Sequence, residues 1–559
     1  MNKIYCLTLA IASIACNAYG QTPKLDKVFA PVVVGVPPSD AYIGLSKMPD
    51  GEIRHYNYGE QKLDKSSYYL SSKDDGFTWK RVNVSPDMVY ADIQSPISGE
   101  FVRIFSTTEG VYSIRTKGGI NGGREINKID DEFSLMIKPP VFVCDGKRIV
   151  VGAHRLGQKG AFTYTSDDDG LTWTISNHVT APLHEISGFH KGLRWNHGAV
   201  EPTVTELSDG RLWMIMRTSQ DKHYQAFSTD GGITWGEAAP SPFYGTITMP
   251  TFHKLKDGRL LFFWSNTTPL PELQGNTGVW DDVFTNRNAT HVAISEDDGK
   301  TWIGARELFL DAGRNEIDFA SKAGMDKSVH QAQCIEVGDG KILAAIGQNT
   351  NHRKMVMFDL DWLYEGGRSN AFENGLHDWT AFKYYKGFQG HCGYNRLEGD
   401  ILVNHTDKAG AKMLNIRYAP NDTLVGDNDG ALWNFPTAKN GTFTTSIKLP
   451  KGAKPVTLLL NDRWFNASDT VATYNAMYKL SLDSKRLKIK DEKWHTIAIK
   501  WTNNKKAVVY VDGKKRLTLP LENPTELGIS YAHFISGNVP DPIGIFVESV
   551  AAEKERLIK

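Results

Sequence analysis

One eight-residue pattern, Ser-x-Asp-x-Gly-x-Thr-Trp, constrains the fold of this chain more than any other feature of its sequence. The Asp and Ser side chains can hydrogen-bond the backbone of their own turn, Gly permits a positive φ, and Trp can pack beneath the turn. One match would mean little, but copies at intervals of about 60 to 95 residues indicate a repeated structural unit. The four copies are Ser72–Trp79, Ser166–Trp173, Ser228–Trp235 and Ser295–Trp302.

A second turn signal, an Asp-Gly pair typical of a tight hairpin, lies about 20 to 40 residues before each copy. The stretch from Glu201 to Trp235 shows a complete unit, with alternating strands on both sides of Asp209-Gly210 and a third strand before the pattern. A hairpin turn and a strand-linking turn that recur together predict the blades of a β-propeller. Two further units without the pattern, over residues 101–116 and 339–360, bring the expected number of blades to six.

The charge balance of the chain argues against several classes of partner. The 559 residues include 64 basic and 64 acidic side chains, so nothing points to nucleic acid or to an acidic membrane surface. Beyond the N-terminus no stretch approaches the 18 apolar residues of a membrane-spanning helix. We therefore expect no membrane span and no nucleic-acid partner. We also expect a monomer.

The first 20 residues are typical of a signal peptide. Lys3 supplies the positive start, residues 4–15 form a short apolar run, and Ala18–Gly20 is a small-x-small cleavage site. This predicts a mature chain from Gln21 that is secreted or periplasmic. An alternative is a lipoprotein whose first residue is Cys16, although the usual Leu three positions earlier is missing.

Three cysteines remain beyond the signal peptide, namely Cys144, Cys334 and Cys392. An odd number allows at most one internal disulfide, and spacings of this size match no metal-binding motif. We therefore expect a fold that depends on its hydrophobic core, with no metal and no cofactor.

The propeller pattern ends near residue 363, and a Gly-containing linker over 364–370 leads to a region of different composition. Its clearest feature is an alternating strand at Trp494–Trp501, followed by a second strand that ends in the Asp512-Gly513 turn. This pattern predicts a β-sandwich over residues 371–559.

The repeated turns are Asp-boxes, and together with the stretch Glu201–Leu212 they resemble the sialidase (neuraminidase), or BNR-repeat, superfamily. The resemblance implies an all-β chain in which a six-bladed β-propeller over residues 21–365 is the catalytic domain. The C-terminal pattern resembles concanavalin-like and laminin-G-like β-sandwiches. Some of these sandwiches bind sugar, and others only brace a catalytic domain.

Glu201 and Arg217 are the first candidate site residues. They lie 16 residues apart across one hairpin, which can set a carboxylate beside a guanidinium at the inner ends of adjacent strands. The resemblance implies that Glu201 polarises the nucleophile and that Arg217 holds the carboxylate of the substrate. The alternative for Arg217 is a rim residue that pairs with a neighbouring blade.

Two further candidates for substrate binding lie in long insertions, which usually form the rim of a propeller site. Arg287 stands where the superfamily has its third carboxylate-binding arginine, although it could equally be an exposed loop residue. His197 ends a histidine-rich insertion that we expect to form a wall of the pocket. The first arginine of the superfamily is missing from the matching stretch, residues 41–46, and Glu60 replaces a later one.

The catalytic groups depart from the superfamily at one position. Its nucleophile is a tyrosine, whereas the matching stretch of this chain offers His330, which suits proton transfer near neutral pH. The alternative for His330 is a packed interior histidine. Asp64, with Glu60 second, is the candidate acid/base, and Asp64 with Glu201 would form the paired carboxylates of a glycosidase.

These features favour an exo-acting glycoside hydrolase that removes a terminal sugar, other than ordinary sialic acid, from a glycan or polysaccharide. Three alternatives stay open: a divergent exo-α-sialidase, a polysaccharide lyase that acts beside a uronate carboxylate, and a non-catalytic carbohydrate-binding protein. The sequence leaves open which sugar is cleaved and whether its configuration is retained or inverted.

Overall fold

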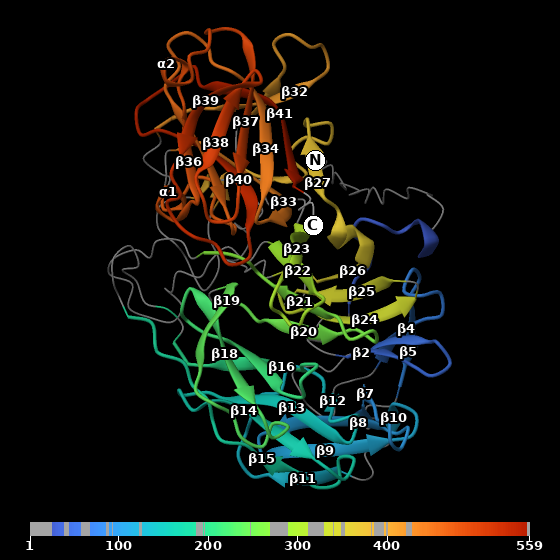
Figure 1. Ribbon diagram of the computed structural model, residues 1–559. Coiled ribbons are helices and arrows are strands. Elements are labelled where there is room, and N and C mark those ends of the chain that lie inside the picture. Colours follow the sequence, from blue (N-terminus) through green and yellow to red (C-terminus); the bar gives the residue numbers. More distant parts are fainter. Residues whose placement is uncertain are drawn as a thin grey trace, which may run out of the picture.

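The computed structural model shows an all-β chain, as predicted, in which the sheets carry nearly all of the regular structure (Figure 1). It describes residues 25–37, 44–56, 68–84, 89–91, 93–121, 126–185, 194, 196–245, 247–268, 289–310, 329–338, 340–347, 353–381, 383–384, 396–397, 401–420 and 428–555. The short helices are η1 (Leu25–Lys27), η7 (Leu360–Tyr364), α1 (Ala472–Asn475) and α2 (Ser484–Leu487).

Six four-stranded antiparallel sheets lie among the described residues of the N-terminal region. The first three consist of β2 (Leu45–Lys47), β3 (Ile53–Tyr56), β4 (Tyr68–Ser72) and β5 (Lys80–Asn83); β7 (Ile93–Gln94), β8 (Phe101–Thr107), β9 (Gly110–Thr116) and β11 (Ile126–Asp130); and β12 (Val141–Val143), β13 (Arg148–Arg155), β14 (Gly160–Ser166) and β15 (Thr174–Ile175). Strands β6 (Val89–Tyr90) and β10 (Ile120–Asn121) pair separately.

The remaining three sheets follow the same plan. They consist of β16 (Val200–Glu206), β17 (Leu212–Arg217), β18 (Lys222–Ser228) and β19 (Ala239–Tyr244); β20 (Thr251–Lys254), β21 (Leu260–Trp264), β22 (Ala289–Ser295) and β23 (Ile303–Leu310); and β24 (Gln333–Gly338), β25 (Lys341–Ile346), β26 (Lys354–Asp359) and β1 (Val32–Gly35). The N-terminal strand β1 thus completes the sixth sheet, where Val32 pairs with Met357.

Consecutive sheets share apolar cores, and these cores form a closed series. For example, Val150 of the third sheet and Met214 of the fourth lie in one core, and Leu45 of the first sheet lies with Leu343 of the sixth in another. Each sheet therefore buries both of its faces against neighbours, which is the packing of a propeller. The prediction of a β-propeller is confirmed.

The Asp-boxes form the turns that their sequence predicts. In the third box, Asp230 Oδ1 accepts hydrogen bonds from Ser228 Oγ at 2.8 Å and from the Thr234 backbone N at 2.9 Å, and Asp230 Oδ2 accepts one from Thr234 Oγ1 at 2.6 Å. The other three boxes repeat these bonds. Trp235 and Trp302 are buried, whereas Trp79 and Trp173 are only half-buried.

The C-terminal region contains two sheets that share one large apolar core. One contains β31 (Leu402–Asn404), β32 (Lys412–Ile416), β41 (Ile545–Lys554), β34 (Gly441–Lys448), β37 (Trp494–Trp501), β38 (Ala507–Val511) and β39 (Lys514–Leu519), with β27 (Gly367–Asn370) paired to β41. The other contains β28 (Trp379–Thr380), β33 (Gly430–Ala438), β40 (Ile529–Ser536), β35 (Val456–Asn461) and β36 (Tyr478–Leu482). Strands β29 (Lys383–Tyr384) and β30 (Arg396–Leu397) pair separately.

Buried polar contacts join this sandwich to the propeller. The Trp464 backbone N donates to Asn266 O at 2.8 Å, and the Thr268 backbone N donates to Trp464 O at 3.1 Å. The Arg463 guanidinium donates to Thr268 Oγ1 at 2.6 Å and lies over the ring of Tyr244 at 3.7 Å from its centroid. The residues directly after β21, Asn266 and Thr268, are therefore bound to the sandwich.

Two smaller predictions concern cysteines and membranes. Cys144 and Cys334 are both free, and Cys392 lies outside the described residues. No helix in the described part of the chain is long and apolar enough to cross a membrane.

We predict that Asp230→Ala lowers the free energy of unfolding by about 1–3 kcal/mol, because the turn loses several hydrogen bonds at once. Urea denaturation measures this change. Thr229→Ala, an exposed substitution in the same turn, is the matched control and leaves the midpoint unchanged. An Asp230→Ala protein as stable as the parent would contradict a structural role for the box.

Candidate functional site

Glu201 is held in an unusual backbone conformation at the start of β16. Its φ is 49°, in the left-handed region that residues other than Gly rarely adopt. The register of β16 and β17 shifts at the same place, because Val200 pairs with Arg217 but Thr203 pairs with Ile215. This β-bulge turns the side chain of Glu201 toward Arg217.

The two side chains form a buried ion pair, with 2.9 Å between Arg217 Nη1 and Glu201 Oε2. Burial alone would raise the pKa of Glu201, but the charge of Arg217, assisted by His154 and Lys138, holds it below its usual value. Glu201 is therefore ionised at neutral pH. This ion pair joins two neighbouring strands of one sheet.

Lys138 reaches across the centre of the ring. It precedes β12 of the third sheet, yet its ammonium donates to Thr251 Oγ1, at the start of β20, and to Ala332 O, just before β24, at 3.3 Å. These acceptors belong to the fifth and sixth sheets, so the ammonium lies near the propeller axis. No carboxylate among the described residues is within ion-pair distance of it. Burial lowers the pKa of Lys138 to about 7, against the opposing charge of Glu201.

The charges of Glu201 and Arg217 affect the pKa values of two histidines. His154, at the end of β13, is buried, and burial lowers its pKa to about 4 although the charge of Glu201 opposes the shift. Burial and the charge of Arg217 also lower the pKa of the half-buried His197. Both imidazoles are therefore neutral at pH 7 and can accept or donate a hydrogen bond.

His330 is packed inside the propeller, with 1% of its surface exposed. Its Nδ1 accepts a hydrogen bond from the Met249 backbone N at 3.2 Å, and its own carbonyl accepts one from Gly347 N at 2.8 Å. The neutral ring then carries its proton on Nε2. These contacts link the starts of the fifth and sixth sheets, as expected of a packed interior histidine, and the catalytic role of His330 stays a prediction.

Three of the predicted site residues cannot be placed relative to this group. Asp64 and Glu60 lie in the stretch 57–67, and Arg287 lies in the stretch 269–288, both outside the described residues. The structure brings together Glu201, Arg217 and His197.

Three buried groups of the propeller were not predicted from the sequence: Lys138, His154 and Arg353. Arg353 precedes β26, and its charge, after burial, lowers the pKa of His55, which pairs with Leu45 in β2. A guanidinium therefore lies near the first sheet. Their position in the sequence could have indicated them, since Lys138 and Arg353, like Glu201, lie where a short apolar strand begins.

The arrangement combines one ionised carboxylate with several cations and neutral imidazoles. Such a site can bind an electron-rich ligand, stabilise a developing positive charge at Glu201 and transfer protons through imidazole or amine. Among the described residues, no group of three or more His, Cys, Asp or Glu side chains is placed to hold a metal ion.

The chain matches the family of BNR repeat-like domains over residues 127–356. None of the curated proteins compared with it matches. Among solved structures, it is similar to a Dyadobacter fermentans protein of unknown function at 14% identity and a TM-score of 0.39, covering 59% of this chain and 98% of that one. It is also similar to Trypanosoma rangeli sialidase in complex with 2,3-difluorosialic acid, at 14% identity and a TM-score of 0.35, covering 95% and 94%.

We predict that Lys138→Met flattens the dependence of stability on pH above neutrality. The pKa of Lys138 is about 7 in the folded chain and 10.5 in its ordinary state, so between these values the unfolded chain binds more protons than the folded one. Its contribution to the free energy of unfolding therefore rises with pH in this range. Urea denaturation from pH 7 to 9.5 measures the rise of the free energy of unfolding with pH. This rise should be smaller for Lys138→Met than for the parent, and the difference in slope should correspond to the uptake of up to one proton on unfolding. Equal slopes would contradict a lowered pKa.

Proposed function

We propose that the chain, which matches the family of BNR repeat-like domains over residues 127–356 and resembles the sialidase superfamily, is a secreted exo-acting glycoside hydrolase that releases a terminal sugar from a glycan or polysaccharide. The main support for the proposal is the buried Glu201–Arg217 ion pair. A β-bulge at Glu201 turns its side chain toward Arg217. Strained backbone of this kind costs about 1–3 kcal/mol and concentrates at functional sites.

Glu201 is the central residue of the proposed reaction. Its negative charge can stabilise the positive charge that develops on the sugar in an oxocarbenium-like transition state, or polarise a nucleophile beside it. Asp64 is proposed as the acid that protonates the leaving oxygen. Arg217 and His197 are proposed to hold the sugar, with Arg287 at the rim.

The cations around Glu201 indicate which charge the substrate carries. Arg217 and Lys138 both act on the single carboxylate of Glu201. An electron-rich terminal sugar, such as a uronic acid, would be attracted to such a site, although a neutral sugar could also enter. We propose a terminal sugar other than sialic acid, because His330 replaces the tyrosine nucleophile that the resemblance implies.

A divergent exo-α-sialidase is the second candidate function, and Arg353 favours it. The superfamily's first arginine is missing from residues 41–46, and the buried Arg353 lies near the neighbouring strand. Arg353 could therefore supply the missing contact with a sialic acid carboxylate. Each charge-assisted contact of this kind contributes roughly 1.5–3 kcal/mol.

We predict that the protein releases a monosaccharide from a member of a panel of complex plant, algal and host glycans, and that Glu201→Gln lowers this turnover by about 10²- to 10⁴-fold. Glu206→Gln, at the other end of the same strand, is the matched control and retains turnover. Chromatography of the products, with ultraviolet absorbance for unsaturated ends, provides the measurement.

Other products would overturn the hydrolase proposal. Unsaturated ends would identify a polysaccharide lyase, and binding without any product would identify a carbohydrate-binding protein. Full activity of a folded Glu201→Gln protein would remove Glu201 from the mechanism.

We further predict weak or no release of 4-methylumbelliferone from its α-sialoside, measured by fluorescence. Release at ordinary sialidase efficiency would instead support the second candidate. In that case Arg353→Ala should raise the KM for the sialoside by about ten-fold or more, through the lost carboxylate contact.

A further inference from the structure

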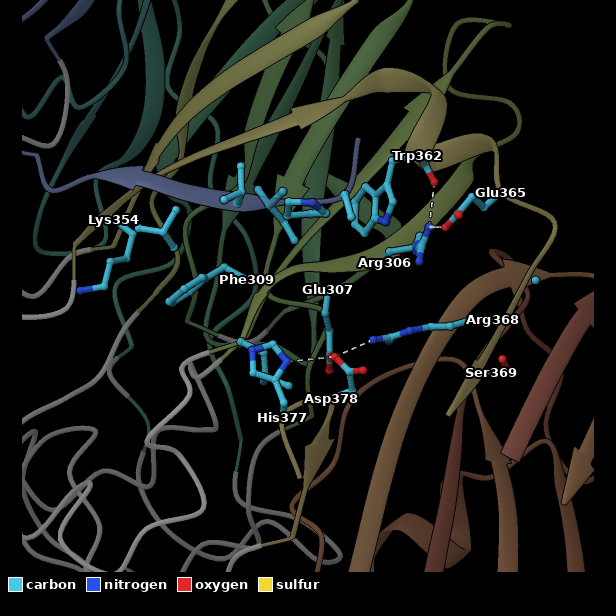
Figure 2. Close-up of a pocket in the computed structure, with 17 residues that line it drawn as sticks. Arg306, Glu307, Phe309, Lys354, Trp362, Glu365, Arg368, Ser369, His377 and Asp378 are labelled. Carbon is cyan, nitrogen blue, oxygen red and sulfur yellow. Dashed lines mark hydrogen bonds and ion pairs between the residues drawn. The ribbon is translucent and has the colours of Figure 1, made fainter. Parts of the chain in front are cut away.

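A cleft of about 880 Å³ lies between the propeller and the sandwich (Figure 2). Propeller strands β1, β23 and β26 supply one side, and residues around β27 and β28 of the sandwich supply the other. Its volume falls within the roughly 300–1,000 Å³ of small-molecule sites. Strands β1 and β23 are the last strands of their sheets, whereas Glu201 begins the first strand of its own. The cleft is therefore separate from the group around Glu201.

The charged side chains that line the cleft balance one another. Three are basic and three are acidic: Arg306, Lys354, Arg368, Glu307, Glu365 and Asp378. Most of this charge is already paired, as in the Arg368–Asp378 ion pair at 2.8 Å. A cleft of this kind offers no net attraction to an anion or a cation, in contrast to the cation-rich surroundings of Glu201.

Its polar groups are fixed before any ligand arrives. Arg368 donates to Asn434 O at 2.8 Å as well as pairing with Asp378, so its guanidinium is held from two sides. Glu307 accepts a hydrogen bond from Tyr531 OH at 2.7 Å. Figure 2 shows Glu307, Arg368 and Asp378 close together, so the cleft presents both hydrogen-bond donors and acceptors.

Apolar surface is exposed beside these polar groups. Phe309 is only partly buried, and Val33 of β1 is 47% exposed. The ligand that fits has hydroxyl groups able both to donate and to accept, apolar C–H faces that pack on a ring, and no net charge. These are the properties of an uncharged sugar.

We propose that this cleft is a second binding site, for a short neutral oligosaccharide. The inference goes beyond the proposed hydrolase activity, because the cleft contains none of the residues assigned to that activity. A chain of sugars held at the junction would contact both domains at once, so either domain alone would bind it poorly.

Isothermal titration calorimetry on the intact Glu201→Gln protein tests the proposal without turnover of the probe. The neutral probes are maltotriose, cellotriose, xylotriose and β-1,4-galactotriose, and the anionic probes are trigalacturonate and 3′-sialyllactose. We expect at least one neutral trisaccharide to bind in the cleft, whereas any binding of an anionic probe at the group around Glu201 should not depend on the cleft residues. A second substitution, Asp378→Asn, should raise the Kd of that trisaccharide by about ten-fold, because the carboxylate that receives hydroxyl hydrogen bonds loses its charge.

Two further variants keep the test decisive. Asp361→Asn changes an exposed carboxylate on η7, outside the cleft, and should leave the Kd unchanged. His377→Ala removes a cleft side chain that is 65% exposed, so the protein should fold normally, and the Kd should again rise.

Three results would overturn the proposal: no binding of any neutral trisaccharide, a Kd for an anionic probe that rises with Asp378→Asn as much as the Kd of the neutral one, or a Kd for the neutral probe that neither Asp378→Asn nor His377→Ala changes. Turnover of glycans by the parent protein is measured separately. Turnover without cleft binding removes only this inference, and cleft binding without turnover removes only the hydrolase proposal.

Discussion

Closure of the propeller ring is the constraint on which the rest of the structure depends. The Gln333 side chain accepts hydrogen bonds from Gly44 N at 2.8 Å and Leu45 N at 3.0 Å, which joins the inner edge of the last sheet to the first. Strand β1 adds the outer strand of that last sheet. Because each sheet packs on two neighbours, no core is complete until the ring closes, and closure brings the polar starts of the inner strands together.

Closure of the ring buries the charged groups of the site, and this burial affects their protonation. Glu201, Arg217 and Lys138 lose most of their contact with water, and buried ion pairs seldom repay that loss in stability. Arg217 and Lys138 keep Glu201 ionised despite this burial, whereas the burial itself keeps His154 neutral. The arrangement is therefore better explained by a role in binding and proton transfer than by a contribution to folding.

The sandwich gives the chain a second polar site, the cleft at its junction with the propeller, in which positive and negative charges balance. It is fixed to the propeller through Trp464 and Arg463, which bind the loop after β21, and through Tyr531, which binds Glu307. These buried contacts hold the two domains in one arrangement. The junction is thus a fixed and balanced surface, whereas the axis of the propeller is rich in cations.

The sequence by itself determined the repeating unit, because each Asp-box and each hairpin turn is specified by residues a few positions apart; Gly210, with φ of 82°, is one example. It also predicted the Glu201–Arg217 pair, since one hairpin sets their distance. Only the tertiary structure revealed Lys138 and Arg353, whose neighbours come from other sheets, and the interdomain cleft, whose lining comes from both domains. Local turn chemistry is encoded in adjacent residues, but contacts across a ring exist only after distant segments have met.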